Sequence, residues 1–190
     1  MFDLYNIAKF IGLKPRAVAE IGVNEPHLSA VRRFHGECPM ILVEPLTDCA
    51  SALIQAYPQA RVICAAIADQ TGSAKFYPRG QTSWLMDLPR TPAIDEDKAV
   101  IDPSHIVDIA TRRFDSIDPG NLDIVAIDTE GAEWFVLKHM ISRPKLLCVE
   151  THNPSRRYQN PYFTEIKNWT RENGYIKLGE EFADSLYALP

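Results

Sequence analysis

Three short apolar runs, each accompanied by a carboxylate at its C-terminal end, constrain what this chain can fold into. Consecutive apolar positions indicate strands that are buried on both faces, as in a parallel sheet. The runs begin about 20 residues apart, and the segments between them carry helix signals, which predicts strand–helix–strand units with right-handed crossovers. The runs cover residues 17–22, 40–43 and 61–68, and the carboxylates are Glu20, Glu44 and Asp69.

The remainder of the chain completes an α/β pattern within a single predicted domain of residues 1–190. The N-terminal 1–14 segment is predicted to hold a helix, and residues 78–104, rich in proline and charge, form a long substrate or lid loop. Helices are expected after Pro26, after Thr47, over 132–140 and over 161–170. Strands are expected over 73–77, 105–110 (or one helical turn), 122–127 and 146–149, with a closing antiparallel pair at 175–178 and 185–189.

Composition and charge exclude several classes of protein. The chain is 46% apolar and 24% charged, which is ordinary for a globular domain, and no apolar run reaches the length of a membrane helix. A net charge of −5 argues against a nucleic-acid partner. The four cysteines lack metal-type spacing and the N-terminus lacks signal-peptide features, so we expect reduced thiols in a cytoplasmic protein. The sequence leaves homodimerisation open.

The turn after the first run predicts a ligand site. In open α/β sheets, ligands bind beyond the carboxyl ends of the strands, where Gly22 would allow close approach to the backbone. Glu44 follows Gly22 by about 20 residues, the spacing of a carboxylate that accepts hydrogen bonds from ribose hydroxyls; a helix-capping role is the alternative. A single glycine provides no pyrophosphate cradle, which favours S-adenosylmethionine over NAD.

Six segments in this order resemble the FkbM family of S-adenosylmethionine-dependent methyltransferases, over roughly residues 15–189. They are residues 20–24, 43–45, 66–72, 113–117, 127–133 and 149–152, of which Asp128-Thr-Glu-Gly-Ala-Glu133 is the most specific. The resemblance implies a class I methyltransferase fold, a Rossmann-like three-layer sandwich whose mostly parallel seven-stranded sheet has an antiparallel last strand. It also implies O-methylation of a sugar or natural-product hydroxyl.

The same resemblance assigns the cofactor-binding residues. Glu20 and Gly22, with Asn24 beside them, would lie against the methionine portion, and Glu44 would accept from the ribose hydroxyls. Ala66 to Asp69 would lie near the adenine, and Asp128 near the sulfonium. Pro26 departs from the family, which tends to have glycine at this position.

A hydroxyl acceptor must lose a proton, and the polar strand ends carry side chains that could accept it. Asp128, Glu130 and His152 are the catalytic candidates, with His152 preferred as general base; a histidine bonded only to its own loop is the alternative. Together with Glu150 they could bind a divalent cation, but the spacing gives no support and no metal is predicted.

Two further features and two other functions remain open. Trp84 would either stack on an acceptor or plug the loop, and Arg156-Arg157 would bind an anionic acceptor or form a solvated turn. A non-catalytic protein that binds the cofactor or a partner is the main alternative function, and an NAD-linked enzyme is the weaker one.

Overall fold

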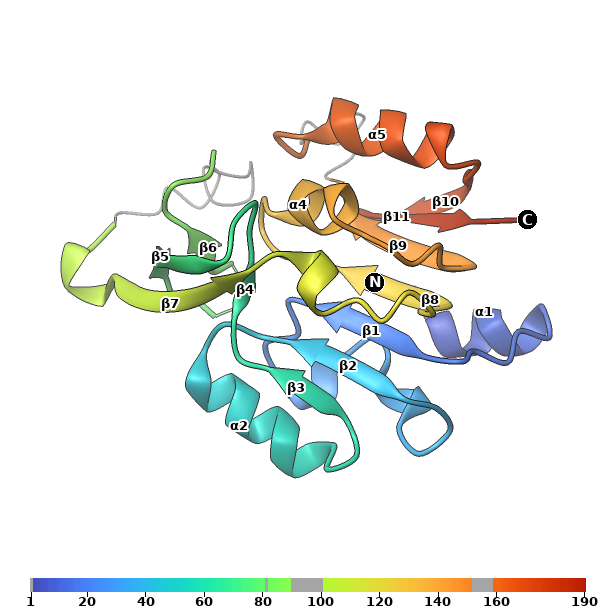
Figure 1. Cartoon of the computed structure of the whole chain (residues 1–190), viewed down its shortest axis with the longest axis horizontal. Helices are drawn as coiled ribbons and strands as arrows, with labels where there is room; N and C mark the ends of the chain where they lie inside the picture. Colours follow the sequence, from blue (N-terminus) through green and yellow to red (C-terminus); the bar gives the residue numbers. More distant parts are fainter. Residues whose placement is uncertain (1, 81, 90–100, 152–158) are drawn as a thin grey trace.

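The computed structural model describes residues 2–80, 82–89, 101–151 and 159–190 (Figure 1). Its main sheet has seven strands in the order β10-β11-β9-β8-β1-β2-β3. Five of them are joined to one another by parallel pairing: β1 (Val18–Ile21), β2 (Met40–Val43), β3 (Arg61–Ile63), β8 (Ile124–Ile127) and β9 (Leu146–Glu150). β11 (Asp184–Ala188) runs antiparallel between β9 and β10 (Ile176–Glu181), which confirms the predicted closing pair and the predicted fold class.

Apolar side chains on both faces of this sheet produce three layers, because β1, β2, β8 and β9 are buried throughout. One face packs against α1 (Leu4–Phe10) and α2 (Thr47–Ala56) through Leu4, Ala8 and Leu53. The other face packs against α4 (Glu133–Lys138) and α5 (Phe163–Glu172) through Val136, Leu137 and Ile166.

The prediction of a long helix after Pro26 is wrong. The structure has two short 3-10 turns there, η1 (Pro26–Leu28) and η2 (Arg32–Phe34). The backbone N–H groups of Ala30 and Val31 donate to the buried carboxylate of Glu20, instead of to carbonyls four residues earlier. An acidic side chain from the preceding strand thus replaces part of the helical hydrogen bonding.

The prediction of a single strand over residues 61–68 is also wrong, because the chain passes from one sheet to another within this segment. β3 ends at Ile63, a tight turn follows in which Ala65 N–H donates to the Ile63 carbonyl at 3.1 Å, and β4 (Ala66–Ile67) joins a second sheet. Both halves are apolar, so a continuous apolar pattern does not reveal the turn.

The second sheet has the order β4-β7-β5-β6 and was not predicted as a sheet. It contains the expected strand β5 (Gly72–Tyr77), the expected strand β7 (Val107–Arg112), and β6 (Trp84–Leu85) from the long 78–104 segment. The helical turn offered as the alternative near residue 105 is present too, as η3 (Pro103–His105) just before β7.

Trp84 anchors the described part of this segment. Its side chain is only 2% exposed, and its ring lies 4.8 Å from that of Tyr77 on the neighbouring strand. The indole therefore serves as the hydrophobic plug, and stacking on an acceptor does not fit this position. Figure 1 shows the second sheet projecting from one side of the main sheet, with β4 as its nearest strand.

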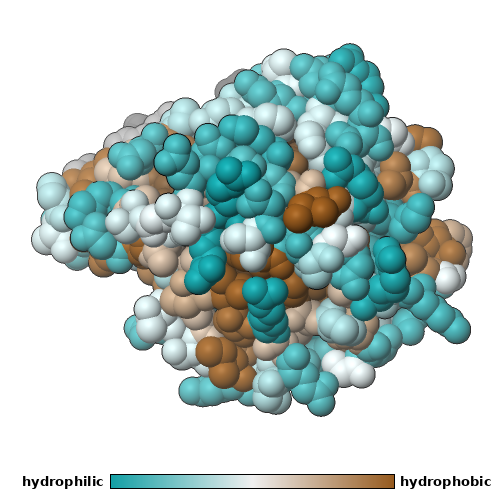
Figure 2. All heavy atoms as spheres, viewed as in Figure 1, coloured by the Kyte–Doolittle hydropathy of each residue, from teal (hydrophilic) through white to brown (hydrophobic). Residues whose placement is uncertain are grey.

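The surface in the same view is largely hydrophilic, with separate apolar areas (Figure 2). Strongly exposed large apolar side chains include Phe10 and Phe182, at 91% and 68% exposure. Within the described residues, we find no helix whose length and apolar character would let it cross a membrane.

Candidate functional site

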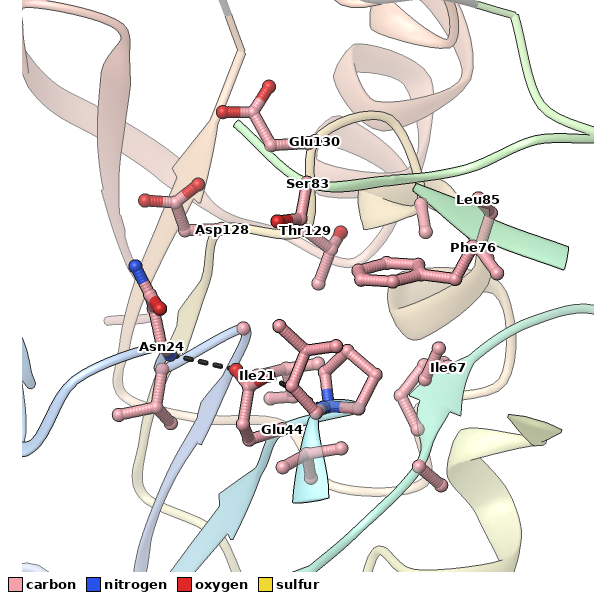
Figure 3. Close-up of a pocket in the computed structure, with 18 of the residues that line it drawn as sticks. Ile21, Asn24, Glu44, Ile67, Phe76, Ser83, Leu85, Asp128, Thr129 and Glu130 are labelled. Carbon is pink, nitrogen blue, oxygen red and sulfur yellow. Dashed lines mark hydrogen bonds between the residues drawn. The ribbon is translucent and has the colours of Figure 1, made fainter. Parts of the chain in front are cut away.

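A cavity of about 320 Å³ lies beyond the carboxyl ends of β1, β2 and β8, with the second sheet as its far wall (Figure 3). Its position follows from the topology, since the strand order reverses between β1 and β8 and leaves a crevice there. The two ends of the cavity differ: Asn24, Asp128 and Glu130 lie at one side, and Ile67, Phe76 and Leu85 at the other. This arrangement suits a ligand with a charged end and an apolar ring.

Gly22 lines the cavity in a way that the sequence did not predict. Its φ is +84°, and a Cβ placed on it would lie 1.7 Å from the carbonyl oxygen of Asp128. Glycine is therefore required because the end of β8 packs against the turn after β1. The sequence predicts that a ligand approaches the Gly22 backbone closely. In the structure the Asp128 carbonyl of the same chain makes this close approach.

Glu20 lines the same cavity and is 2% exposed. Its carboxylate accepts from the Ser29 hydroxyl at 2.6 Å and from the backbone N–H groups of Ala30 and Val31 at 3.0 and 3.3 Å. Burial nevertheless raises the pKa of Glu20 to about 7, against the opposing effect of these hydrogen bonds. The carboxylate shapes the wall of the cavity, and its contact with a cofactor stays a prediction.

Glu20 should make folding stability depend on pH. The folded state binds this proton more tightly than the unfolded chain, whose pKa is near 4.5, so stability falls as pH rises from about 4.5 to about 7. We expect Glu20→Gln to remove a contribution to this slope of at most about 3 kcal/mol. Urea denaturation at several pH values measures it, with exposed Glu172→Gln as control. An unchanged slope in Glu20→Gln would contradict the assignment.

Glu44 lies at the end of β2 and is 4% exposed. One carboxylate oxygen accepts the backbone N–H of Asn24 at 2.8 Å and the other accepts that of Leu46 at 2.9 Å. Burial raises the pKa of Glu44. The helix-capping alternative therefore holds in part, because Glu44 holds the residue that precedes α2. Glu44 also lines the cavity (Figure 3), and its role as the ribose carboxylate stays a prediction.

Asn24 supplies a polar group that the described part of the chain leaves without a partner. Its backbone is left-handed, with φ +58°, and its N–H is held by Glu44. Its side-chain Nδ2 is buried and meets no hydrogen-bond acceptor among the described residues, whereas Oδ1 receives a weak contact from Cys49 Sγ at 3.7 Å. A buried amide donor beside a cavity is costly unless a ligand accepts from it.

Three carboxylates meet at the polar end of the cavity. Asp128, Glu130 and Glu150 each offer an oxygen within 4.8 Å of the others. Burial raises the pKa of Asp128 to about 7, helped by the nearby charges of Asp184 and Glu133. Burial and the charge of Asp128 raise the pKa of Glu150 as well. Near neutral pH, the cluster therefore retains a proton and can exchange it.

The carboxylate cluster also has the oxygen ligands that divalent cations prefer. Acidic groups that are close together do not by themselves define a metal site. The prediction of no metal stays untested.

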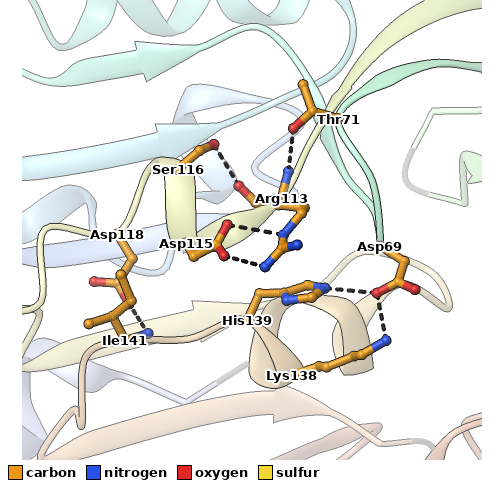
Figure 4. A network of polar contacts seen from close by, with 9 residues as sticks. All are labelled: Asp69, Thr71, Arg113, Asp115, Ser116, Asp118, Lys138, His139 and Ile141. Atoms are coloured by element: carbon orange, nitrogen blue, oxygen red, sulfur yellow. Dashed lines mark hydrogen bonds and ion pairs between the residues drawn. The ribbon is translucent and has the colours of Figure 1, made fainter.

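Asp69, predicted near the adenine, does not line the cavity. Its carboxylate accepts from Lys138 Nζ at 2.6 Å and pairs with His139 Nε2 at 2.8 Å (Figure 4). Hydrogen bonds, first from Lys138 and then from His139, lower its pKa. Its neighbour Ala66, also predicted, does line the cavity, as does Ile67. The partners of Asp69 lie 69 and 70 positions away, so no local pattern reveals them.

His152, the preferred general base, lies outside the described residues, as do Arg156 and Arg157. The sequence missed several cavity residues altogether. Phe76, Ser83 and Leu85 come from the second sheet and the 78–104 segment, and Thr129 lies between two predicted residues. The apolar positions in β5 and β6 were visible, but nothing in the sequence showed that these strands would face the cavity.

The fold and the cavity together define a class of protein. A seven-stranded sheet with one antiparallel strand inserted before its edge, and a cavity at the carboxyl ends of β1 and β2, is the arrangement of a class I S-adenosylmethionine-dependent methyltransferase. Residues 17–177 match the Methyltransferase FkbM domain family, and the chain belongs to this family. The resemblance read from the sequence is thereby confirmed, and the cofactor is S-adenosylmethionine. This finding displaces the NAD-linked alternative.

The chain is similar to several solved methyltransferase structures. A candidate RNA methyltransferase from Pyrococcus horikoshii matches with a TM-score of 0.50 and 12% identity, over 99% of this chain and 82% of that one. The methyltransferase domain of bacterial CtHen1 matches with a TM-score of 0.47 and 11% identity, over 98% and 95% of the two chains. At these identities, the first match supports the fold alone. A sequence comparison with curated proteins found no match.

A third solved structure is the 1,6-didemethyltoxoflavin-N1-methyltransferase of Burkholderia thailandensis, with bound 1,6-didemethyltoxoflavin and S-adenosylhomocysteine. It matches with a TM-score of 0.46 and 10% identity, over 98% of this chain and 74% of that one.

The residues of the cavity fit S-adenosylmethionine. Glu44 can accept hydrogen bonds from vicinal hydroxyls, since each of its oxygens receives one backbone N–H from the described residues and a carboxylate oxygen can accept more than one. The Nδ2 of Asn24, which has no partner in the described part of the chain, suits a carboxylate acceptor. Ile67 and Phe76 provide apolar surface for a purine ring. These are the residues that would hold the cofactor.

Proposed function

We propose that this chain methylates a hydroxyl group of a small-molecule acceptor, such as a sugar or another natural product. The observation that carries the proposal is the group of carboxylates at the polar end of the cavity, where Asp128 has a pKa raised to about 7. A hydroxyl is a poor nucleophile unless a base removes its proton, and a base works best when its pKa lies near the working pH.

The residues of this chain would orient the acceptor hydroxyl and accept its proton. The bound cofactor supplies an electrophilic methyl group. Asp128 and Glu130, which line the cavity, would accept the hydroxyl proton and orient the oxygen. His152 remains the other predicted base. Positioning of the two reactants supplies much of the acceleration in a displacement of this kind.

A small neutral or cationic acceptor fits the cavity better than a nucleic acid does. The cavity edge carries Glu20, Glu44, Asp128 and Glu130, and the net charge of the chain is −5, so a phosphate backbone would be repelled. Besides Ile67 and Phe76, which would meet the purine ring, Leu28 and Leu85 line the cavity with apolar side chains. Such surfaces bind the ring faces of sugars and of aromatic natural products.

Labelling with S-adenosylmethionine that carries a tritiated methyl group tests the proposal. We expect label from the purified protein to enter small molecules in an extract or in a panel of hydroxylated compounds. Mass spectrometry and NMR of the product should then place the methyl group on oxygen. Asp128→Asn should greatly reduce incorporation.

Three results would contradict the proposal. Label on nitrogen would remove the hydroxyl assignment, and label in RNA or protein would remove the small-molecule assignment. Intact cofactor binding with no transfer to any fraction of the extract would favour the non-catalytic alternative.

A further inference from the structure

Glu133 is a buried carboxylate that lies next to the carboxylate cluster but does not line the cavity. It is 0% exposed, although it stands at the start of α4. Its Oε1 accepts the backbone N–H and the hydroxyl of Thr129, both at 2.9 Å. Both carboxylate oxygens accept the backbone N–H of Gly131 at 3.1 Å. One side chain therefore holds the loop that follows β8.

This loop has a backbone conformation that needs such support. Glu130 has a φ of +52°, which is unusual for a residue other than glycine, and Gly131 has a φ of +110°. A left-handed residue of this kind costs about 1–2 kcal/mol unless its surroundings hold it. The conformation matters because Asp128 and Glu130, on either side of Thr129, present their carboxylates at the cavity.

Asn160 connects Glu133 to β9. Its Nδ2 donates to Glu133 Oε2 at 2.5 Å and to the Glu150 carbonyl at 3.5 Å. Its backbone N–H donates to the Thr151 carbonyl at 3.0 Å, and the residue is only 2% exposed. The Glu133–Asn160 pair thus joins the loop after β8 to the end of β9, from which the third carboxylate of the cluster comes.

We propose that the Glu133–Asn160 pair positions the Asp128, Glu130 and Glu150 carboxylates toward the cationic methyl donor. Like charges within 4.8 Å repel one another, so a flexible loop would let them separate. A backbone fixed by a buried anion and a buried amide holds them in place. The pair lies outside the cavity lining and therefore acts through the cluster. The proposal depends on the cofactor and is independent of the acceptor.

Isothermal titration with S-adenosylmethionine and with S-adenosylhomocysteine tests this proposal, because the two ligands differ by the methyl group and the sulfonium charge. We expect Glu133→Gln and Asn160→Asp each to weaken S-adenosylmethionine binding about 10-fold. Binding of S-adenosylhomocysteine should weaken less, so that the ratio of the two dissociation constants shifts. A purely structural role would weaken both ligands alike.

The double variant Glu133→Gln/Asn160→Asp tests the hydrogen bond between the two side chains most directly. It reverses the donor and the acceptor between the two side chains, so the hydrogen bond can re-form. We expect the affinity ratio to return to within about 3-fold of the wild type. If the single variants do not fold, recovery of folding and of the ratio in the double variant still supports the pair.

Asp118→Asn is the matched control. Asp118 is also a buried carboxylate, 6% exposed, which accepts the backbone N–H groups of Gly120, Ile141 and Ser142, but it lines no part of the cavity (Figure 4). We expect it to lower stability without shifting the affinity ratio. The proposal is overturned if folded Glu133→Gln keeps the wild-type ratio, if Asp118→Asn shifts it equally, or if the double variant shows no recovery.

Discussion

Gly22→Ala is expected to destabilise the protein by about 3–5 kcal/mol, although it adds only one methyl group. The added Cβ would lie 1.7 Å from the Asp128 carbonyl oxygen, so β1 or β8 must move. The left-handed φ of +84° accounts for about 1–2 kcal/mol of this as strain for alanine. Because Asp128 also lines the cavity, cofactor binding should be lost along with stability. Urea denaturation measures the first effect and calorimetric titration the second.

Gly36→Ala separates the steric clash from the backbone strain as the cause of the lost stability. Gly36 has nearly the same backbone conformation, with φ +81°, but a Cβ there would meet nothing within 4 Å. We expect a loss of about 1–2 kcal/mol and unchanged cofactor binding. If Gly22→Ala costs no more than Gly36→Ala, the close approach of β1 and β8 does not explain why position 22 is glycine.

Asp128→Asn is expected to lower turnover about 100-fold or more, the usual effect of removing a general base. In the wild type, turnover should rise as pH increases through about 7, because Asp128 must lose its proton before it can accept another. The asparagine variant should lack this rise. Initial rates across pH 5.5–8.5, with the acceptor found by labelling, measure both effects.

His152→Ala provides the comparison for this prediction. If Asp128 is the base, the histidine variant should keep the pH dependence that Asp128→Asn loses. If His152 is the base, its removal should cost about 100-fold with intact cofactor binding, and the aspartate variant should retain the rise with pH. Wild-type turnover in Asp128→Asn would contradict the assignment of the carboxylates.

The parallel core of the fold could be predicted because its strands carry apolar residues at nearly every position. The buried strands are β1, β2, β8 and β9, and runs of consecutive apolar residues in the sequence indicate this burial on both faces. The break after Ile63 was invisible, since apolar residues continue on both sides of the turn. The 3-10 turns after Pro26 depend on the Glu20 carboxylate, a contact across ten positions that periodicity does not report.

The candidate site shows the same limit. Glu44 was placed correctly at the cavity by its distance from Gly22 and by its position at a strand end. Asp69 shares the second property but pairs with Lys138 and His139 instead, because the chain has already left the main sheet at that point. A strand-end carboxylate faces the ligand only if its strand stays in the sheet that forms the crevice.

The residues that support the site were harder to recognise than those that line it. Glu133 belongs to the Asp-x-Glu-Gly-x-Glu segment on which the family resemblance rested, yet its role emerges only from the hydrogen bonds to Thr129, Gly131 and Asn160. Asn160 directly precedes the predicted 161–170 helix, and that position indicates only a helix start. Its contact with Glu133 spans 27 positions, and only the folded chain shows it.

Calorimetric titration of the wild type and of Glu44→Ala with S-adenosylmethionine tests the central claim most directly, that this cavity is the cofactor site. The account predicts saturable binding to the wild type and a loss of about 1–3 kcal/mol in Glu44→Ala, the cost of leaving ribose hydroxyls unpaired. Circular dichroism would verify that the variant is folded. No binding by the folded wild type up to millimolar cofactor, or equal affinity in Glu44→Ala, would contradict the account.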